Sequence, residues 1–149
     1  MFLRACDYVS YAMFINYKKG EIGHLKVEMR AIEKGFTVCY PRVESRFDMI
    51  LVDDTGKCFK AQVKYTDHEP TESDNAIIVS LTKQTRNTGK RKRYTKEEVD
   101  VVLAYIPKMD KILWIGPDLF DNKATLTFRM APSKNNQTTG TRNISDFVW

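Results

Sequence analysis

The chain has 149 residues, of which 42% are hydrophobic, and we expect one domain over residues 1–149 with a buried core. The 24 Lys and Arg residues outnumber the 19 Asp and Glu residues, so the net charge of +5 favours a polyanionic partner. The three cysteines lack C-x-x-C spacing and support neither a disulfide framework nor a zinc site. These cysteines fit a reducing cytosol, so we expect a cytoplasmic protein. No apolar run reaches transmembrane length, and we expect no membrane partner.

The first 18 residues are rich in aromatic side chains. Four of them recur every three residues: Tyr8, Tyr11, Phe14 and Tyr17. This spacing is typical of one helix face that packs on the body of the protein or on a second subunit. We therefore interpret residues 1–18 as a helical segment with a possible role in oligomerisation.

A second helical pattern begins at Lys19 and ends at Gly35, a residue type that commonly terminates helices. Its apolar side chains have the spacing of a buried stripe: Ile22, Leu25, Met29 and Ile32. On an adjoining face of the same helix lie Glu21, His24 and Glu28.

Three strands are predicted next, over residues 36–40, 45–52 and 59–64, with a turn at 53–57. Side chains alternate between the two faces of a strand, so Gln62 and Lys64 point the same way while Ala61 and Val63 point into the core. Asp48 on the neighbouring strand can join the first pair. The carboxylate and amide oxygens suit a hard divalent cation, and the lysine suits a place beside an attacking water. By itself, this combination also occurs on ordinary solvated sheet faces.

The middle of the chain alternates acidic and basic segments. Residues 67–74 are acidic and predict a solvated loop, with a second metal site as the alternative. An apolar strand is predicted over 76–81. The run that follows carries cations and no acid: Lys83, Arg86, Lys90, Arg91, Lys92 and Arg93. We expect a loop there, which either contacts DNA phosphates or is simply solvated.

The last third of the chain predicts more strands than helix. Residues 95–98 have capping-box spacing, but the β-branched residues after them limit any helix to a brief one. Strands are predicted over 101–106, 111–115 and 125–130. A polar tail then offers four candidates for contacts with phosphates or bases: Lys134, Asn135, Asn136 and Gln137.

These motifs together resemble the PD-(D/E)XK nuclease superfamily. The matching segments are Lys19–Gly23, Lys34–Val38 with Pro41, Arg46–Asp48, Gln62–Thr66, and Pro132 with Lys134–Gln137. Within the superfamily, the pattern is similar to a small branch that includes a group I intron-encoded homing endonuclease and lies near the archaeal Holliday junction resolvases. The resemblance implies a restriction-endonuclease-like α/β fold, in which a mixed central β-sheet is flanked by helices.

The resemblance also implies roles for individual residues. Asp48 matches the metal-binding aspartate and Lys64 the catalytic lysine, while the Val63 carbonyl completes the strand's share of the metal site. Gln62 stands where many relatives have Glu or Asp. His24 stands where relatives usually have a helix glutamate, so Glu21 and Glu28, one turn to either side, are the alternative ligands on that helix, and we place Glu21 in the site. The resemblance implies Mg²⁺ as the cofactor. Mn²⁺ is the alternative, because the imidazole of His24 is a better ligand for Mn²⁺ than for Mg²⁺.

The function implied is that of a site-specific DNA endonuclease of the homing type, which cleaves double-stranded DNA. Two alternatives remain at this stage: a junction-resolving or repair nuclease, and a catalytically silent DNA-binding module. Cleavage of both strands of a duplex requires two active sites. We therefore expect a homodimer or a dimer of dimers.

Overall fold

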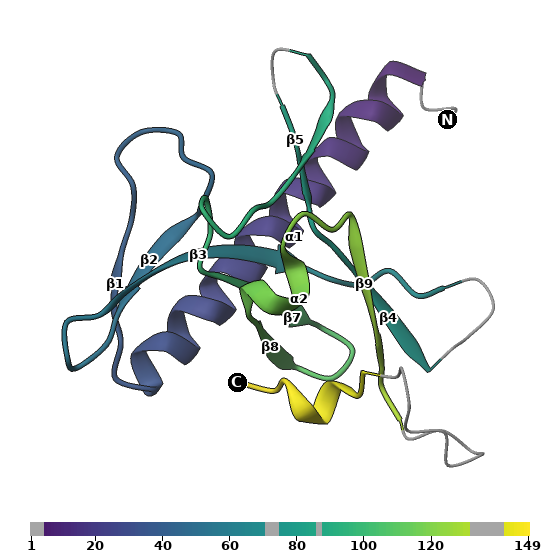
Figure 1. Ribbon diagram of the computed structural model, residues 1–149. Coiled ribbons are helices and arrows are strands. Elements are labelled where there is room, and N and C mark those ends of the chain that lie inside the picture. Colours follow the sequence, from purple (N-terminus) through teal and green to yellow (C-terminus); the bar gives the residue numbers. More distant parts are fainter. Residues whose placement is uncertain (1–4, 71–74, 86–87, 132–141) are drawn as a thin grey trace.

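The computed structural model describes residues 5–70, 75–85, 88–131 and 142–149, with the side chains of the first helix from residue 11 onwards (Figure 1). In chain order, the elements are α1 (Ala5–Glu33), β1 (Thr37–Cys39), β2 (Met49–Val52), β3 (Cys58–Tyr65), β4 (Ala76–Ser80), β5 (Thr82–Gln84), β6 (Arg91–Arg93), β7 (Val101–Ile106), β8 (Lys111–Ile115), α2 (Pro117–Phe120), β9 (Thr125–Arg129) and the 3-10 helix η1 (Ile144–Asp146). Neither α-helix in this part of the chain is both long and apolar enough to cross a membrane.

The central sheet has five strands in the order β1-β2-β3-β7-β8. Its strands pair in antiparallel fashion except for β3 and β7, which run parallel, with Gln62 opposite Val102. The prediction of a mixed sheet in an α/β fold is confirmed. Two small ribbons, β4–β9 and β5–β6, lie outside this sheet.

A hydrophobic core lies on each face of the sheet. All six residues of β7 are buried, and alternate ones contribute to opposite cores because strand side chains alternate. On the side of α1, Ala61 and Val63 pack with Val27 and Ala31, as the alternation in β3 predicted. The other core contains residues of β4, β9 and α2, including the fully buried Phe120.

The helix α1 differs from the prediction in two ways. It is one continuous helix of 29 residues rather than two segments. It ends before Gly35, whose φ of 85° suits glycine. The expected buried stripe is wrong, because its four members are between 44% and 63% exposed: Ile22, Leu25, Met29 and Ile32.

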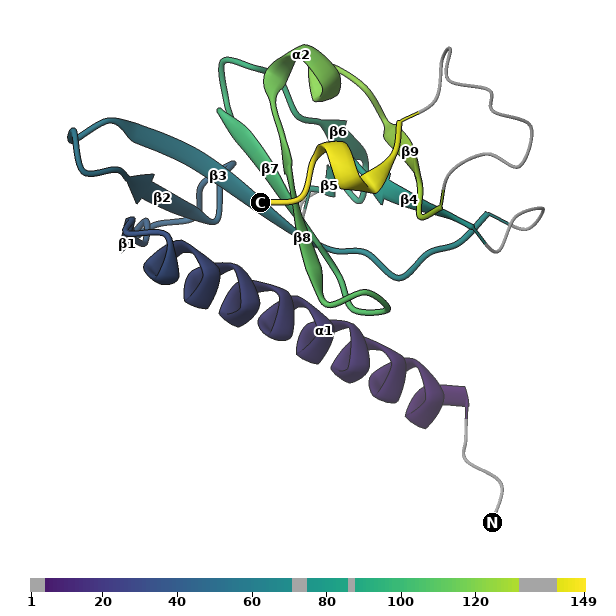
Figure 2. The same ribbon diagram turned by 90° about the horizontal axis from the view of Figure 1, so that it is seen from below.

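The buried face of α1 consists of smaller residues. Val27 and Ala31 are fully buried, and Gly23 is buried too. A Cβ at Gly23 would lie 3.4 Å from the Cβ of Tyr65, so the glycine lets the helix backbone approach β3 closely. Figure 2 shows α1 as an outer layer along one side of the sheet. A helix with apolar residues on two faces packs through the face that allows the closer approach.

Two shorter segments also depart from the prediction. The basic segment that we expected to be a loop contains a hairpin, in which Lys83 of β5 pairs with Lys92 of β6. The strand expected over residues 45–52 begins only at Met49, so Asp48 directly precedes it. Residues 96–98 form a turn without a helix.

Candidate active site

Asp48 is fixed to β3 through its backbone and its carboxylate. Its backbone N–H donates to the Ala61 carbonyl at 2.9 Å, which extends the pairing of β2 with β3 by one residue. Its carboxylate accepts from the Val63 backbone N–H at 2.9 Å and from the Gln62 amide. Asp48 therefore lies beside β3 with little freedom to turn away.

Gln62 has an unsatisfied oxygen in this arrangement. Its amide nitrogen donates to the Asp48 carboxylate and to the Val63 carbonyl, 3.2 Å away, while its buried Oε1 has no hydrogen-bond partner among the described residues. An amide group is nearly symmetric in shape, so turning it by half a revolution exchanges the two atoms. Gln62 Oε1 would then face the Asp48 carboxylate and the Val63 carbonyl. Three oxygens of this kind fit a divalent cation.

His24 is the residue of α1 that reaches this site. Its Nε2 lies 3.4 Å from the Asp48 carboxylate. The hydrogen bond with Asp48 raises the pKa of His24, and burial opposes this shift. Glu21 is exposed and makes no hydrogen bond or ion pair with the described residues. Glu28 is engaged with Tyr40, whose pKa is raised to about 12, mainly by burial.

Lys64 lies on the same side of β3 as Gln62 and is held by two contacts. Its Nζ donates to the Thr82 carbonyl at 2.9 Å and lies 4.9 Å from the centroid of the Tyr94 ring. Burial lowers the pKa of Lys64 to about 8, although the charge of Asp48 acts in the opposite direction. Three further cations contribute to the lowering: Lys83, Arg46 and Arg91. Near neutral pH, this amine can therefore exchange its proton.

Arg46 and Tyr94 complete the surroundings of Lys64, and our reading of the sequence assigned no role to either. The Arg46 guanidinium lies 4.8 Å from the centroid of the Tyr94 ring and donates to Glu98 at 3.3 Å. Tyr94 is fully buried, and its hydroxyl has no hydrogen-bond partner in the described part of the chain. Arg46 belongs to the Arg46–Asp48 segment, one of the motifs that carried the family resemblance, so its place near the site could have been inferred. Tyr94 is far from that segment along the chain, and no motif includes it.

A groove with a volume of about 400 Å³ opens beside Asp48. The loop between β1 and β2 lines one side, and Lys83 and Gln84 of β5 line the other. Lys83 Nζ donates to the Ser45 carbonyl at 3.2 Å, which joins the hairpin to that loop. The β5–β6 hairpin therefore borders the groove that leads to Asp48.

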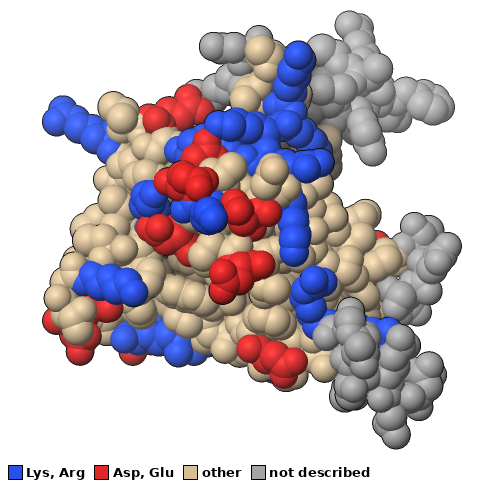
Figure 3. All heavy atoms as spheres, in the orientation of Figure 1, with Lys and Arg blue, Asp and Glu red and all other residues tan. Residues whose placement is uncertain are grey.

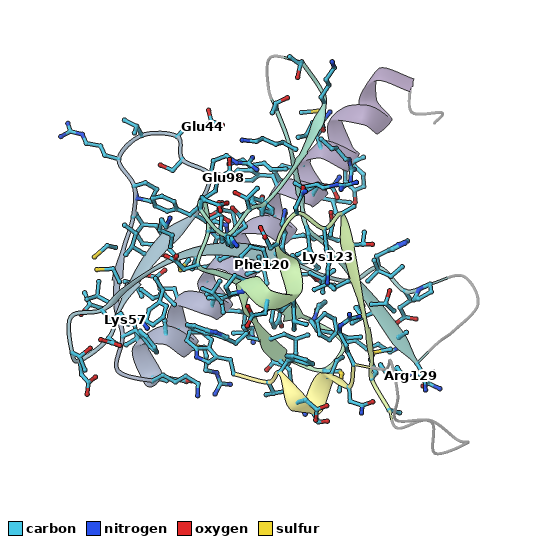
Figure 4. All side chains as sticks on the ribbon, viewed as in Figure 1. Glu44, Lys57, Glu98, Phe120, Lys123 and Arg129 are labelled. Atoms are coloured by element: carbon cyan, nitrogen blue, oxygen red, sulfur yellow. The ribbon has the colours of Figure 1, made fainter. Side chains whose placement is uncertain are left out.

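The cations of β6 are exposed, and some of them are paired. Lys92 forms an ion pair with Glu98, whereas Lys90 and Arg91 form no ion pair with any described acid. In Figure 3, Lys and Arg side chains gather over the hairpin, and a group of acids lies next to them. Figure 4 shows Glu98 between the hairpin and the loop that carries Glu44. This face of the hairpin is thus partly neutralised.

The remaining predicted site residues lie outside the described part of the chain: Arg86, Lys134, Asn135, Asn136 and Gln137. Among the described residues, no cluster of three His, Cys, Asp or Glu side chains is placed to hold a metal ion. A metal site at Asp48 would therefore depend on the Gln62 amide and the Val63 carbonyl.

The fold resembles that of a known nuclease. A structure described as that of a bacterial homing endonuclease, I-Ssp6803I, matches with a TM-score of 0.67 and 21% sequence identity. The match covers 89% of this chain and 87% of that one. At this identity, the likeness establishes the fold alone. Among curated proteins, none matches the sequence.

The family itself is established by a sequence model. The model for the PD-(D/E)XK endonucleases matches residues 15–149, which is nearly the whole chain. The chain belongs to the PD-(D/E)XK endonuclease family and is a nuclease. The resemblance inferred from the motifs is confirmed, and DNA is the substrate that the family implies.

Proposed function

We propose that this protein is a divalent-metal-dependent DNA endonuclease whose active site comprises Asp48, Gln62 and Lys64. One observation carries the proposal: an anchored carboxylate, a buried amide with an unpaired oxygen and a deeply set lysine lie together on neighbouring strands. This combination supplies metal ligands and a proton-exchanging group within one short stretch of sheet. The proposal treats residues 1–149 as one nuclease domain in the cytoplasm.

The cation would be held by Asp48, Gln62 and the Val63 carbonyl, with His24 as the ligand from α1. When bound, Mg²⁺ or Mn²⁺ supplies Lewis-acid polarisation of the phosphate and lowers the pKa of a bound water. The place of His24, 3.4 Å from the Asp48 carboxylate, favours it over Glu21, which acts on His24 through its charge and forms no ion pair with a described residue. An imidazole ligand also favours Mn²⁺ relative to Mg²⁺.

Lys64 would act on the attacking water and on the developing charge. With its pKa near 8, the amine has a neutral fraction at cellular pH that can accept a proton from water. Its protonated fraction offsets negative charge on the phosphate as the phosphodiester bond breaks. The bond that breaks is the one to the 3′ oxygen, which leaves a 5′-phosphate.

Double-stranded DNA would approach along the groove beside Asp48. Lys83, Lys90 and Arg91 of the hairpin segment would contact phosphates there. Lys83 borders the groove, and Lys90 and Arg91 are exposed and form no ion pair with a described acid. We propose the same role for Lys92 and Arg93, and for four residues outside the described ranges: Lys134, Asn135, Asn136 and Gln137. A duplex cut in both strands would involve a homodimer or a dimer of dimers.

We propose site-specific cleavage of the homing type, because the similar structure is described as a homing endonuclease. The test is a cleavage assay on duplex DNA and on four-way junctions, with Mg²⁺ and separately with Mn²⁺. Cuts at defined positions in the duplex support the proposal. Cuts confined to junctions would favour a resolving nuclease, and DNA binding without cleavage under either metal would favour a silent DNA-binding module.

A further inference from the structure

Tyr94 is fully buried, and its ring lies against two cations. Lys64 Nζ is 4.9 Å from the centroid of the ring, and the central carbon of the Arg46 guanidinium is 4.8 Å from it. Among the described residues, no other aromatic ring is shared by two cations in this way. The active site proposed above uses Lys64 but assigns Tyr94 no part. A shared ring beside the proposed lysine points to a role in placing that lysine.

The side chain of Lys64 needs more than one contact to hold its charged end in one place. A lysine has a flexible four-carbon stem and three N–H donors, and its charge is costly to bury without partners. The Thr82 carbonyl, 2.9 Å from Nζ, accepts from one of these donors and fixes the group in one direction. The face of an aromatic ring attracts a cation, and does so more strongly away from water. The Tyr94 ring therefore fixes a second direction.

Tyr94 is itself held firmly, at the end of the hairpin that carries Thr82. Its backbone N–H donates to the Leu81 carbonyl at 3.2 Å, and its carbonyl accepts from the Asn122 N–H at 2.9 Å. Its ring belongs to the hydrophobic core that contains β4 and β9. Both supports of Lys64, the Thr82 carbonyl and the Tyr94 ring, thus lie at the base of the β5–β6 hairpin. Neither depends on a flexible surface side chain.

Lys64 does not pair with the opposite charge in its vicinity. The Asp48 carboxylate is close enough for its charge to act on Lys64, yet no hydrogen bond or ion pair joins these two described residues. Such an ion pair would engage the carboxylate that the proposed metal site needs. The ring and the Thr82 carbonyl are neutral, so they hold the amine and leave the Asp48 carboxylate with its contacts to β3.

Arg46 increases the need for the ring. Its guanidinium donates to the Arg93 carbonyl at 3.0 Å and to Glu98 at 3.3 Å, so contacts of its own fix its place. Like charges repel, and the charge of Arg46 acts on Lys64. Without the ring, this repulsion and the attraction of Asp48 would both act on an ammonium group with one remaining hydrogen bond. We expect the group to move toward Asp48 in that case.

We propose that Tyr94 is a positioning residue, whose ring holds the Lys64 ammonium group at the Thr82 carbonyl and apart from the Asp48 carboxylate. The role rests on the function proposed above, in which Lys64 acts on the attacking water. It belongs to the ring rather than to the hydroxyl, because the hydroxyl has no hydrogen-bond partner among the described residues. Phenylalanine should therefore be able to replace Tyr94, whereas leucine should not.

The first experiment compares Tyr94→Leu with Tyr94→Phe in single-turnover cleavage of saturating duplex DNA. A displaced amine slows the chemical step without changing DNA binding, because misplacement by about 1 Å can cost about 100-fold in rate. We expect Tyr94→Leu to be slower by about 10–100-fold with a Kd for DNA within about twofold of the wild type, and Tyr94→Phe to stay within about threefold of the wild-type rate. The control is Phe128→Leu, which removes an equally buried ring from the same core and should not lower the rate.

The outcomes distinguish the positioning role from the nuclease proposal. Equal rates for Tyr94→Leu and Phe128→Leu, with Lys64→Met inactive, would overturn the positioning role and leave the nuclease proposal standing. A wild type that cuts no DNA overturns the nuclease proposal, and the place of Lys64 is then decided by the measurement below. If Tyr94→Leu does not fold, Tyr94→Met takes its place, because a flexible methionine side chain fills gaps in a core.

The second experiment locates the Lys64 ammonium group by NMR of isotope-labelled lysine, without DNA or metal. Protons that lie over the face of an aromatic ring are shifted upfield, and Lys64→Met identifies the Lys64 signal by its loss. The Hε signal should lie upfield of those of exposed lysines in the wild type and in Tyr94→Phe, and should return toward them in Tyr94→Leu. An unshifted signal in the wild type, or an equal upfield shift in Tyr94→Leu, would overturn the proposal.

Discussion

The Asp48 site and the β5–β6 hairpin are both proposed to act on DNA, but they are built in opposite ways. At the Asp48 site, the side chains of Asp48, Gln62 and Lys64 are each held by a defined hydrogen bond, as the Asp48 carboxylate is by the Val63 N–H. On the hairpin, Lys90 and Arg91 are exposed and form no ion pair with a described acid. A rigid, partly buried site suits chemistry, whereas exposed cations suit attraction to a phosphate chain. The first region should control the rate of cleavage and the second the affinity.

The two regions are joined through Lys64. Its Nζ donates to the carbonyl of Thr82, the first residue of the hairpin, and the charges of Lys83 and Arg91 lower its pKa. The hairpin therefore acts on the site through backbone position and charge even before DNA binds. Substitution of cations far from Lys64 should change DNA affinity without changing the cleavage rate. Substitution of Lys83 or Arg91 should change both.

The largest effect on cleavage is expected from substitutions at Asp48 and Lys64. Asp48→Asn removes a ligand charge while keeping the side-chain shape, and Lys64→Met removes the amine. Each should lower the single-turnover cleavage rate by about 10²–10³-fold or more, with DNA affinity nearly unchanged. The control is Asp54→Asn, which changes an exposed acid in the turn before β3. Wild-type rates for either site variant would show that the chemistry lies elsewhere.

The hairpin should give the opposite pattern. Replacing Lys90 and Arg91 with Ala should weaken DNA binding and reduce the slope of log affinity against log salt by about 0.9 for each lost phosphate contact. Cleavage of saturating DNA should change much less. Lys57→Ala, in the β2–β3 turn far from the hairpin (Figure 4), is the matched control. An unchanged slope would mean that the hairpin is merely solvated.

The buried amine of Lys64 predicts a dependence of stability on pH. Its pKa is lowered from 10.5 to about 8 in the folded chain. Between these values, the unfolded chain binds more protons, so stability rises with pH across that window. Relative to Lys64→Met, the wild type should gain about 2 kcal/mol in free energy of unfolding from about pH 7 to about pH 9.5. The measurement is urea unfolding at each pH.

Lys57→Met is the control for the gain in free energy of unfolding between about pH 7 and about pH 9.5. This lysine is exposed in the β2–β3 turn, so its replacement should leave the pH profile of stability parallel to that of the wild type. Parallel profiles for the wild type and Lys64→Met would contradict the burial of a titrating amine in the site.

The smallest expected effect concerns the helix ligand. His24→Glu places a hard anionic oxygen near Asp48 and should raise Mg²⁺-supported cleavage severalfold relative to Mn²⁺-supported cleavage. Glu21→Gln should change both activities much less, because Glu21 is exposed and acts on His24 only through its charge. A loss of activity with Glu21→Gln would restore Glu21 as the ligand. No change in the metal preference of His24→Glu would mean that α1 supplies no ligand.

The grouping of Asp48, Gln62 and Lys64 could be predicted from the sequence because it depends on local rules. Strand alternation places Gln62 and Lys64 together, and a short turn brings Asp48 beside them. The outward direction of Leu25 and Met29 could not be predicted in this way. Helical spacing identifies apolar faces, but the choice between two such faces depends on how closely Gly23 approaches Tyr65.

The position of Tyr94 beside Lys64 and the pairing of the β5–β6 hairpin were not predicted from the sequence, for different reasons. The burial of Tyr94 against Lys64 and Arg46 arises from tertiary packing that no local pattern encodes. The strand Arg91–Arg93 consists of exposed cations, so neither apolar alternation nor β-propensity marks it. Its pairing with Thr82–Gln84 supplies the hydrogen bonds that define it.

The central claim is that Asp48 and Gln62, with the Val63 carbonyl, hold a divalent cation. The most direct measurement is a titration with Mn²⁺ followed by electron paramagnetic resonance, which counts bound metal without any cleavage. The account predicts one site in the wild type and in Asp54→Asn, and affinity at least about tenfold weaker in Asp48→Asn and in Gln62→Leu. Equal binding by all four proteins would contradict the assignment of the metal to the Asp48 site.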